Sequence, residues 1–359
     1  MKILIVPLNW GLGHAARCIP LIRKYAADGC EVVLGGDGDS LTLLRKQFPE
    51  LRSVEFPALK LTYSESNTQV GAMIRMLPRL IIGSLRDHYA LKRLLATESF
   101  DRVISDNRFG LYTSLRQKSR WLPRRKRMQP LPAEKRKEPE TIYITHQVMI
   151  KLPIGLRWME PIVAAIHRNI ITRYTQCWIP DYAGENNLSG DLSHKYELPR
   201  NAKFIGPLSR FPAAKSHSLY GDKLQTYPAV AVLSGLEPQR TLLEEQLMQE
   251  YADREERLLV VRGLMDQPNT LITHKNITLV PYLNDSDLQD ALLATRTIIA
   301  RSGYSTLMDL AALGCIDKAR LIPTPGQTEQ EYLARHLQQK KQQNSSSEKD
   351  NNPLKKQQL

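Results

Sequence analysis

The feature that most limits the fold of this chain is a repeated alternation of short apolar runs with stretches of helical period. Each apolar run ends in a polar turn, which is the pattern of parallel strands joined by crossover helices. In the first half we expect strands at residues 3–7, 31–34, 54–56, 102–105, 141–144 and 176–180. In the second half we expect them at residues 229–233, 258–261, 277–280, 298–300 and 320–322. The pattern predicts an α/β protein with two similar halves that face a common cleft.

The stretches between these runs predict helices. We expect them at residues 17–28, 40–48, 70–97, 158–174 and 238–248, the first of them ended by Gly29. Pro78 lies inside the long third stretch and is expected to break or kink it. The same stretch is basic and amphipathic, so it either faces the core or lies on a membrane surface.

A chain of 359 residues exceeds what one hydrophobic core usually holds. We therefore expect a first domain at residues 1–207, a linker at 208–227 and a second domain at 228–337. The remaining residues, 338–359, are rich in Gln, Lys, Ser and Asn. Such a composition does not bury a core, so this tail is expected to be disordered.

Most of the net charge of +13 lies in one segment. Residues 116–137 contain ten Lys or Arg and one acid, Glu134, which leaves nine positive charges there. The prolines of this segment predict an exposed loop, inserted at residues 116–140 of the first domain. The loop either docks on anionic lipid headgroups, where each basic residue contributes about 1 kcal/mol, or is a solvated insertion without a partner.

Cysteine usage and hydropathy point to the cytoplasm. The four cysteines, Cys18, Cys30, Cys177 and Cys315, show no C-x-x-C spacing, so we expect buried reduced thiols. No apolar stretch approaches the roughly 20 residues that span a bilayer. We expect a cytoplasmic protein, with contact at the inner face of the cytoplasmic membrane left open by the basic segments.

The residues that follow the run at 298–300 carry the strongest functional signal. They read R-S-G-Y-S-T-L-M-D at 301–309, a turn and a helix start whose free N–H groups favour an anion. We predict donor contacts from Arg301, Ser302, Gly303, Ser305 and Thr306. Asp309 is placed to bind a ribose hydroxyl, or else forms a capping box with Thr306. Gln327, Glu329 and Gln330 can hydrogen-bond sugar hydroxyls, so the segment indicates a nucleotide-sugar.

The first predicted turn, G-L-G-H-A-A-R at 11–17, is the second candidate. Gly11 and Gly13 allow close approach of backbone to a ligand, and the helix start favours negative charge. Histidine side chains in general suit proton transfer near neutral pH, so His14 is a candidate for that role, or else it bonds within its own turn. Arg17 either contacts phosphate or balances surface charge.

These two motifs resemble those of MurG-like glycosyltransferases, the family 28 group of the GT-B superfamily. That signature runs R-S-G-x-x-T-x-x-E, A-A-x-G, P and Q-x-x-N-A. Here the acid is the shorter Asp309, and Leu333 replaces the final Asn. The G-x-G-H-x-x-R turn is similar to that of GT-B transferases and of related nucleotide-sugar hydrolases. The resemblance implies a GT-B fold, in which two Rossmann-like domains face each other across a cleft.

The resemblance also implies an activity. We expect a hexosyltransferase that moves a sugar from a UDP-sugar, such as UDP-GlcNAc or another UDP-hexose, to an unknown glycan or lipid acceptor. His14 would act at the reacting centre. Relatives commonly close with a helix that returns to the first domain, which the polar tail is not expected to form. No cofactor is expected, and no metal, because helix N-termini and Arg side chains can neutralise a diphosphate without a divalent ion. Asp285-Ser286-Asp287 is interpreted as a helix start.

Further candidates follow the other predicted strands, where α/β sheets place their ligand sites. Ser234 and Gly235 are candidates for phosphate, and Arg262 for the nucleotide. Tyr282 lies in the stretch that in the resembling family touches the base. Asp106, Asn107 and His146 are candidates for the acceptor side.

Two other functions stay open at this stage. One is a nucleotide-sugar hydrolase of the same fold, which gives the sugar to water. The other is a basic binding protein that uses residues 116–137 on nucleic acid or anionic membrane. No series of stacking aromatics accompanies the charge, so nucleic acid is not expected as the partner.

Overall fold

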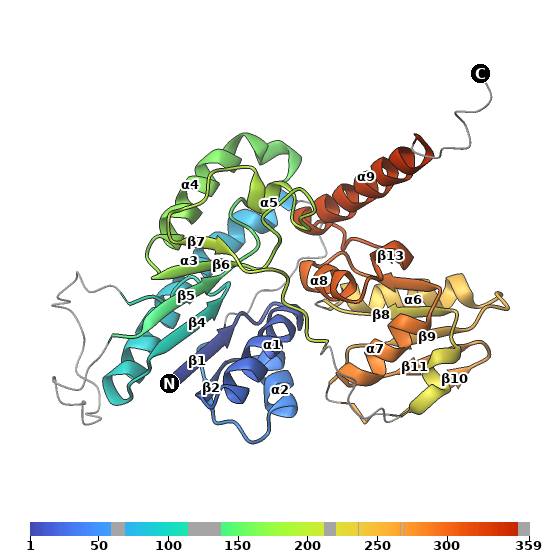
Figure 1. Cartoon of the computed structure of the whole chain (residues 1–359), viewed down its shortest axis with the longest axis horizontal. Coiled ribbons are helices and arrows are strands. Elements are labelled where there is room, and N and C mark those ends of the chain that lie inside the picture. Colours follow the sequence, from blue (N-terminus) through green and yellow to red (C-terminus); the bar gives the residue numbers. More distant parts are fainter. Residues whose placement is uncertain are drawn as a thin grey trace.

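The computed structural model describes residues 1–58, 69–113, 138–211, 220–235, 237–265, 267–268 and 270–350 (Figure 1). The basic loop expected at residues 116–140 therefore lies outside the described residues, except for its last three positions. The same holds for residues 212–219 of the expected linker and for 351–359 of the expected tail.

The first lobe is built on a seven-stranded sheet in which every neighbouring pair is parallel. The strand order is β3-β2-β1-β4-β5-β6-β7. The strands are β1 (Lys2–Pro7), β2 (Glu31–Gly36), β3 (Ser53–Glu55), β4 (Arg102–Asp106), β5 (Glu140–Ile144), β6 (Gln176–Ile179) and β7 (Ala202–Phe204). The six strands predicted for this half are confirmed, and β7 is an additional edge strand at the approach to the linker.

Helices cover both faces of this sheet. They are α1 (Gly13–Ala27), α2 (Gly38–Gln47), α3 (Gln69–Thr97), α4 (Glu160–Ile171), preceded by the 3-10 turn η2 (Ile154–Met159), and α5 (Asp191–His194). Ile3 and Ile5 share a buried cluster with α1 and α2, whereas Leu4 packs with Leu91 of α3. Because side chains alternate along a strand, α3 lies on the opposite face from α1 and α2.

Helix α4 covers the same face as α3. Ile171 of α4 packs against Tyr143, whose neighbours in β5, Ile142 and Ile144, point into the cluster with α1 and α2. Helix α3 is continuous through Pro78, so of the two outcomes expected there a break does not occur.

The second lobe is built on a six-stranded sheet with the order β10-β11-β9-β8-β12-β13. Its strands are β8 (Ala229–Val232), β9 (Leu258–Val261), β10 (Ile272–His274), β11 (Ile277–Val280), β12 (Thr297–Ala300) and β13 (Ala319–Leu321). The five predicted strands are confirmed. The unpredicted β10 is a short antiparallel edge strand with exposed residues, too short for a recognisable pattern.

The helices of the second lobe are α6 (Gln239–Tyr251), α7 (Asp285–Ala294) and α8 (Tyr304–Ala312), with 3-10 turns η3 (Gly221–Thr226) and η4 (Ile316–Lys318). Val230 and Ala231 of β8 pack into different clusters, one on each face of the sheet. The interpretation of Asp285-Ser286-Asp287 as a helix start is confirmed, since α7 begins at Asp285 and the side chain of Asn284 accepts from the N–H of Asp287.

Each sheet reverses its winding direction at one place. In the first sheet this switch point lies between β1 and β4, and in the second between β8 and β12. Ligands of doubly wound sheets bind beyond the carboxyl ends of the strands at such points. The fold therefore brings together the turns that carried the sequence motifs.

The first turns of the last described helix, α9 (Thr328–Asp350), lie beside α5 of the first lobe, and the rest of the helix extends outward (Figure 1). Leu333 and Leu337 are buried with Leu188 and Leu192 of the first lobe, and Lys340 donates to the carbonyls of Glu185 and Asn187. Two expectations are thus wrong: residues 338–350 are helical and not disordered, and a closing helix is present. Gln, Lys and Glu are good helix formers, and two leucines four residues apart suffice to anchor the helix.

Two other expectations concern exposure. Cys18, Cys177 and Cys315 are buried free thiols, as predicted, whereas Cys30 is a free thiol that is half-buried. Within the described residues, none of the helices combines the length and apolar character needed to cross a bilayer.

Candidate active site

A cavity of about 1570 Å³ lies between the two lobes. Its walls include the turns after β1 and β8 and the first turns of α8 and α9. The cavity is lined by sixteen of the predicted site residues: Gly11, Gly13, His14, Arg17, Asn107, His146, Ser234, Gly235, Tyr282, Gly303, Ser305, Thr306, Asp309, Gln327, Glu329 and Gln330. Asp106, Arg262, Arg301 and Ser302 are not among its lining residues.

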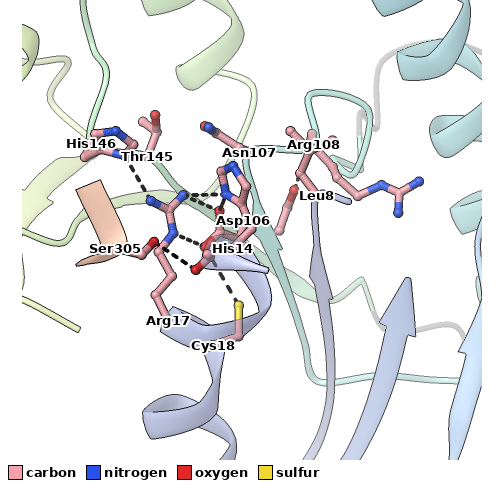
Figure 2. A network of polar contacts seen from close by, with 12 residues as sticks. Leu8, His14, Arg17, Cys18, Asp106, Asn107, Arg108, Thr145, His146 and Ser305 are labelled. Atoms are coloured by element: carbon pink, nitrogen blue, oxygen red, sulfur yellow. Dashed lines mark hydrogen bonds and ion pairs between the residues drawn. The ribbon is translucent and has the colours of Figure 1, made fainter. Parts of the chain in front are cut away.

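His14 and Asp106 form a hydrogen-bonded pair beside the cavity (Figure 2). Nδ1 of His14 lies 2.8 Å from Oδ1 of Asp106. Burial opposes ionisation of Asp106, but the charges of Arg17 and His14 outweigh it and lower the pKa of this carboxyl to about 2. Nη2 of Arg17 also lies 3.0 Å from Nδ1 of His14, but this nitrogen already donates to Asp106. Because an ionised carboxylate only accepts hydrogen bonds, we assign the proton to Nδ1, which leaves Nε2 as the basic nitrogen of the ring.

Asp106 was predicted to contact the acceptor, and this is corrected. Its side chain is fully buried beneath His14 and Arg17, and Sγ of Cys18 approaches it from below at 3.8 Å. A carboxylate in this position orients the imidazole and stabilises its protonated form without touching a ligand itself.

Arg17 lies one turn after His14 in α1 and is also buried. Its Nε and Nη2 donate to the two oxygens of Asp106, and its Nη1 lies 2.9 Å from Nδ1 of His146. Every guanidinium nitrogen thus has a partner in the protein. The prediction that Arg17 contacts phosphate is corrected: the side chain holds Asp106 and His146 in place.

These contacts also determine which ring nitrogen of His146 carries the proton. A guanidinium cannot accept a hydrogen bond, so Nδ1 of His146 is the acceptor and its Nε2 carries the proton. That Nε2 donates to Oε1 of Glu329 over 2.6 Å. Burial lowers the pKa of His146, which keeps the ring neutral near pH 7. A polar chain therefore runs from Asp106 through Arg17 and His146 to Glu329, from one lobe to the other.

The two lobes meet directly at the start of α8. Oγ of Ser305 donates to the carbonyl of Gly13 over 2.8 Å. A Cβ at position 13 would lie 3.0 Å from that Oγ, so the glycine allows this close approach. The ring of Tyr304 stacks on His146 with 4.0 Å between centroids, and its hydroxyl donates to the carbonyl of Pro180.

The start of α8 has the character of an anion site. Its N-cap, Gly303, supplies no side-chain cap, and the first turn lines the cavity. The turn of Ser234 and Gly235 lines the same region, and a Cβ placed on Gly11 of the first lobe would be in ordinary van der Waals contact with Cα of Gly235. Backbone N–H groups at a helix start attract phosphate oxygens, so a diphosphate fits between these turns.

The predicted donor contacts of three residues are corrected. Arg301 is buried and donates to the carbonyls of Gln239 and Pro323, which ties the start of α6 to the loop after β13. Ser302 is buried and donates to the carbonyl of Gln330. Arg262 pairs with Glu244 of α6. None of these three side chains lines the cavity.

Asp309 lies in the cavity wall, but its carboxylate is held by the linker. Oδ1 accepts from the hydroxyl of Ser209 at 2.8 Å and from the N–H of Arg210 at 3.1 Å, and Nε of Arg210 lies 3.2 Å from Oδ2. The alternative of a capping box with Thr306 is wrong, because the helix begins at Tyr304 after an N-cap at Gly303. Burial raises the pKa of Asp309.

The three sugar-binding candidates near α9 also have protein partners. Glu329 accepts from His146 and from Nε2 of Gln147, so its expected contact with sugar hydroxyls competes with an existing contact between the lobes. Gln330 accepts from the N–H of Thr324 and donates to Gln327. All three still line the cavity, and their role toward a sugar stays a prediction.

The first-lobe end of the cavity is largely apolar. It lies between α3 on one side and η2 and α4 on the other. Its apolar lining comprises Leu80, Phe109, Ile150, Leu152, Leu156, Met159 and Val163. Asn107, which carries a positive φ of 55° directly after β4, lines the cavity between this apolar arm and His14.

Several site residues were missed by sequence reasoning. Tyr304 stands inside the motif at 301–309 but was passed over as a spacer, although an aromatic between two predicted contact residues was a usable signal. Gln147 follows His146 and could have been included with it. Arg210 and Lys46 gave no signal, because their place beside the cavity depends on how the lobes pack.

Comparison with solved structures supports this architecture. SnogD, a glycosyltransferase from Streptomyces nogalater, matches with a TM-score of 0.52 and 16% identity over 94% of this chain and 84% of its own. Phytolacca americana UGT2, solved with UDP-2-fluoro-glucose and pterostilbene, gives 0.52 and 15% over 93% and 82%. The spinosyn rhamnosyltransferase SpnG, solved with thymidine diphosphate, gives 0.52 and 13% over 93% and 82%.

The chain thus has the GT-B fold, with two Rossmann-like domains that face each other across a cleft. No family model and no curated protein sequence matches it. The narrower resemblance to MurG-like enzymes of family 28 therefore stays a prediction from the motifs.

Proposed function

We propose that this protein is a glycosyltransferase that moves a sugar from a nucleotide-sugar to a hydroxyl of an acceptor. The proposal rests on one observation: a basic side chain and a helix N-terminus face the same cavity from opposite lobes. The first lobe supplies a histidine whose free Nε2 is basic, and the second supplies an uncapped helix start that suits a diphosphate.

In the proposed reaction, His14 takes up the acceptor proton and the start of α8 stabilises the negative charge of the leaving diphosphate. Nε2 of His14 takes the proton of the acceptor hydroxyl while the oxygen attacks the anomeric carbon. The bond from that carbon to the diphosphate oxygen breaks, and the electron pair leaves with the diphosphate. The N–H groups at the start of α8 stabilise this developing charge, and the ionised Asp106 stabilises the imidazolium. Because α8 supplies this stabilisation, we propose that no metal is needed.

The donor is proposed to be a UDP-sugar, with UDP-GlcNAc or another UDP-hexose as candidates. Tyr282 and the turn after β8 line the part of the cavity that would hold the nucleoside. UGT2 binds a UDP-sugar and SpnG binds thymidine diphosphate, so both bases belong in the test.

The acceptor is proposed to have an apolar part. The apolar arm beyond Asn107 and His14 would bury it, because apolar side chains make up much of the wall there. A lipid or a cell-envelope glycan precursor on a lipid carrier has this chemistry. Such an acceptor would be met at a membrane surface.

A ligand screen tests the donor assignment. UDP, GDP, TDP and their sugars are added to the protein, and the shift in melting temperature is measured. A ligand at 100 times its dissociation constant adds about 2.7 kcal/mol to the free energy of unfolding. We expect a shift of several degrees with UDP or a UDP-sugar. The shift should shrink in Asp309→Asn and persist in the control Asp317→Asn, which alters an exposed carboxylate of η4.

No shift with any nucleotide, in folded protein, would contradict the proposal. Incubation with a radiolabelled UDP-sugar then separates two enzymes of this fold. Release of free sugar without an added acceptor would identify a nucleotide-sugar hydrolase instead of a transferase.

A further inference from the structure

Tyr304, the first residue of α8, lies at the junction of the two lobes. Its side chain is only 3% exposed and belongs to a buried cluster that includes Leu188 and Leu192 of the first lobe and Leu333 of α9. The start of α8, which suits a diphosphate, is therefore packed against the lobe that carries His14. Tyr304 takes an unspecified position of the R-S-G-x-x-T signature, so the motif does not account for it.

The ring of Tyr304 stacks face to face on the imidazole of His146. The two centroids are 4.0 Å apart and the ring planes are 2° from parallel. The imidazole is itself held in place, because its two nitrogens are bound to Arg17 and Glu329. The aromatic ring at the start of α8 thus meets a ring of the first lobe whose orientation is fixed.

The hydroxyl of Tyr304 makes a second contact with the first lobe. It donates over 3.0 Å to the carbonyl of Pro180, which directly follows β6. Burial raises the pKa of Tyr304, so the hydroxyl keeps the proton that it donates. Because β6 belongs to the first sheet, this hydrogen bond ties the start of α8 to the sheet of the opposite lobe.

The residue after Tyr304 extends the junction to α1. Oγ of Ser305 donates over 2.8 Å to the carbonyl of Gly13, the residue directly before His14 (Figure 2). Gly13 begins α1 and Tyr304 begins α8. The starts of two helices are therefore held together, one with the proposed base and the other with the proposed diphosphate site.

The proposed reaction depends on the spacing between these two helix starts. His14 takes the proton of an acceptor hydroxyl in the first lobe, whereas the start of α8 holds the leaving diphosphate. The reacting atoms must approach within about 3–3.5 Å, and a misplacement of about 1 Å can lower the rate about 10²-fold. A side chain that fixes the spacing can therefore affect the rate through geometry alone.

We propose that Tyr304 is a positioning residue that sets the spacing between the start of α8 and His14. Its ring fixes the separation by stacking on His146, and its hydroxyl fixes the direction by bonding to Pro180. The effect on catalysis rests on the proposed function. The effect on the spacing of the lobes does not, and it is measured without any substrate.

Substitutions at two tyrosines separate positioning from a general contribution to stability. Tyr304→Phe keeps the stack and removes the hydrogen bond to Pro180, whereas Tyr304→Leu removes both. The matched controls are Tyr251→Phe and Tyr251→Leu. Tyr251 is 2% exposed, packs in the core of the second lobe and does not line the cavity. Melting temperatures report how far each variant is destabilised.

The kinetic readouts are kcat and KM for UDP release from a UDP-sugar, together with the calorimetric Kd for UDP. We expect Tyr304→Leu to lower kcat about 10²-fold while KM and Kd change by less than about twofold, because the N–H groups of α8 remain in place. Tyr304→Phe should keep at least about a tenth of kcat, since the stack is retained. Both Tyr251 variants should keep kcat.

Spin labels measure the spacing of the lobes directly. They are attached at Asp39→Cys of α2 and Asp317→Cys of η4, two exposed positions, in a Cys30→Ser background that removes the half-buried thiol. Double electron–electron resonance should give one narrow distance distribution with Tyr304 intact and in Tyr304→Phe. The distribution should broaden or shift in Tyr304→Leu.

An unchanged kcat in Tyr304→Leu would overturn the positioning role, as would an equal loss of kcat in an equally destabilised Tyr251→Leu. An unchanged distance distribution in Tyr304→Leu would show that this residue does not set the spacing. Absence of UDP release from the unaltered protein would instead contradict the proposed function and, with it, the effect on catalysis. The distance measurement would still decide whether Tyr304 fixes the lobes.

Discussion

Glu329, in the first turn of α9, accepts a hydrogen bond from His146, two residues after β5, with 2.6 Å between Oε1 and Nε2. The contact joins the last helix of the chain to the first lobe inside the cavity. His146 is neutral and tied to Arg17 by its other nitrogen, so its ring cannot turn without breaking two hydrogen bonds.

A double-mutant cycle with His146→Phe and Glu329→Gln should reveal this coupling. Phenylalanine retains a ring to stack on Tyr304 but removes both hydrogen bonds. We expect a coupling free energy of about 0.5–3 kcal/mol, measured by urea unfolding. The control cycle pairs His146→Phe with Glu245→Gln, an exposed position of α6, and should give no coupling. Equal values in the two cycles would show that the contact does not contribute in solution.

Replacement of Asp106 by Asn should impair proton transfer more than donor binding. The amide keeps the shape of the side chain but lacks the charge that stabilises the imidazolium of His14. We expect kcat for UDP release from the donor to fall about 10²- to 10⁴-fold, with KM for the donor little changed. The control Asp39→Asn removes an exposed carboxylate of α2 and should leave kcat unaltered. A kcat in Asp106→Asn near that of the unaltered enzyme would remove His14 and Asp106 from the proposed mechanism.

The free energy of unfolding should depend on pH because the pKa of Asp106 differs between the folded and unfolded states. Its pKa is lowered to about 2 in the folded protein, below its ordinary value of 3.8. The folded state therefore gains stability above the unfolded pKa and loses it as the pH falls toward 2. The loss is about 2 kcal/mol across this window. The free energies of unfolding of the unaltered chain and Asp106→Asn should thus converge between pH 5 and pH 2. A difference that stays constant with pH would show that the carboxylate is not ionised as described.

Leu333 anchors α9, so truncation of its side chain should destabilise the folded protein. Its side chain is fully buried among residues of both lobes, so Leu333→Ala should lower the free energy of unfolding by about 2–5 kcal/mol. Leu242→Ala, at a half-exposed position of α6, should change it by less than about 0.5 kcal/mol. A similar, small effect at both positions would mean that α9 does not pack on the protein in solution.

Much of the fold could be predicted from the periodicity of the apolar residues and the spacing of the short apolar runs. Eleven strands were predictable because buried parallel strands read as short apolar runs, and the pairing of the lobes followed from the repetition of this pattern. Strand β10 was not predictable, since three exposed residues at a sheet edge carry no apolar run. The end of α9 was misjudged because its polar composition resembles that of a disordered tail, while its anchors lie at Leu333 and Leu337.

The site was predictable in its location more than in its contacts. Strand ends at switch points placed His14, Ser234 and Ser305 around one cavity. The sequence did not reveal that Arg301 faces away from the cavity, because the direction of a turn residue depends on loops more than 20 residues distant. In the same way, Ser209, which holds Asp309, lies 100 residues before it.

One continuous helix carries both Glu329 in the cavity and Lys340 on the carbonyls of Glu185 and Asn187. Eleven residues of α-helix separate them, a rod of roughly 16 Å. A ligand that displaces Glu329 along the helix axis would also displace Lys340, because both residues belong to the same helix. A force applied from outside at the far end of the helix, for example by a fused or bound protein, would be transmitted in the reverse direction and would shift the carboxylate of Glu329 in the cavity.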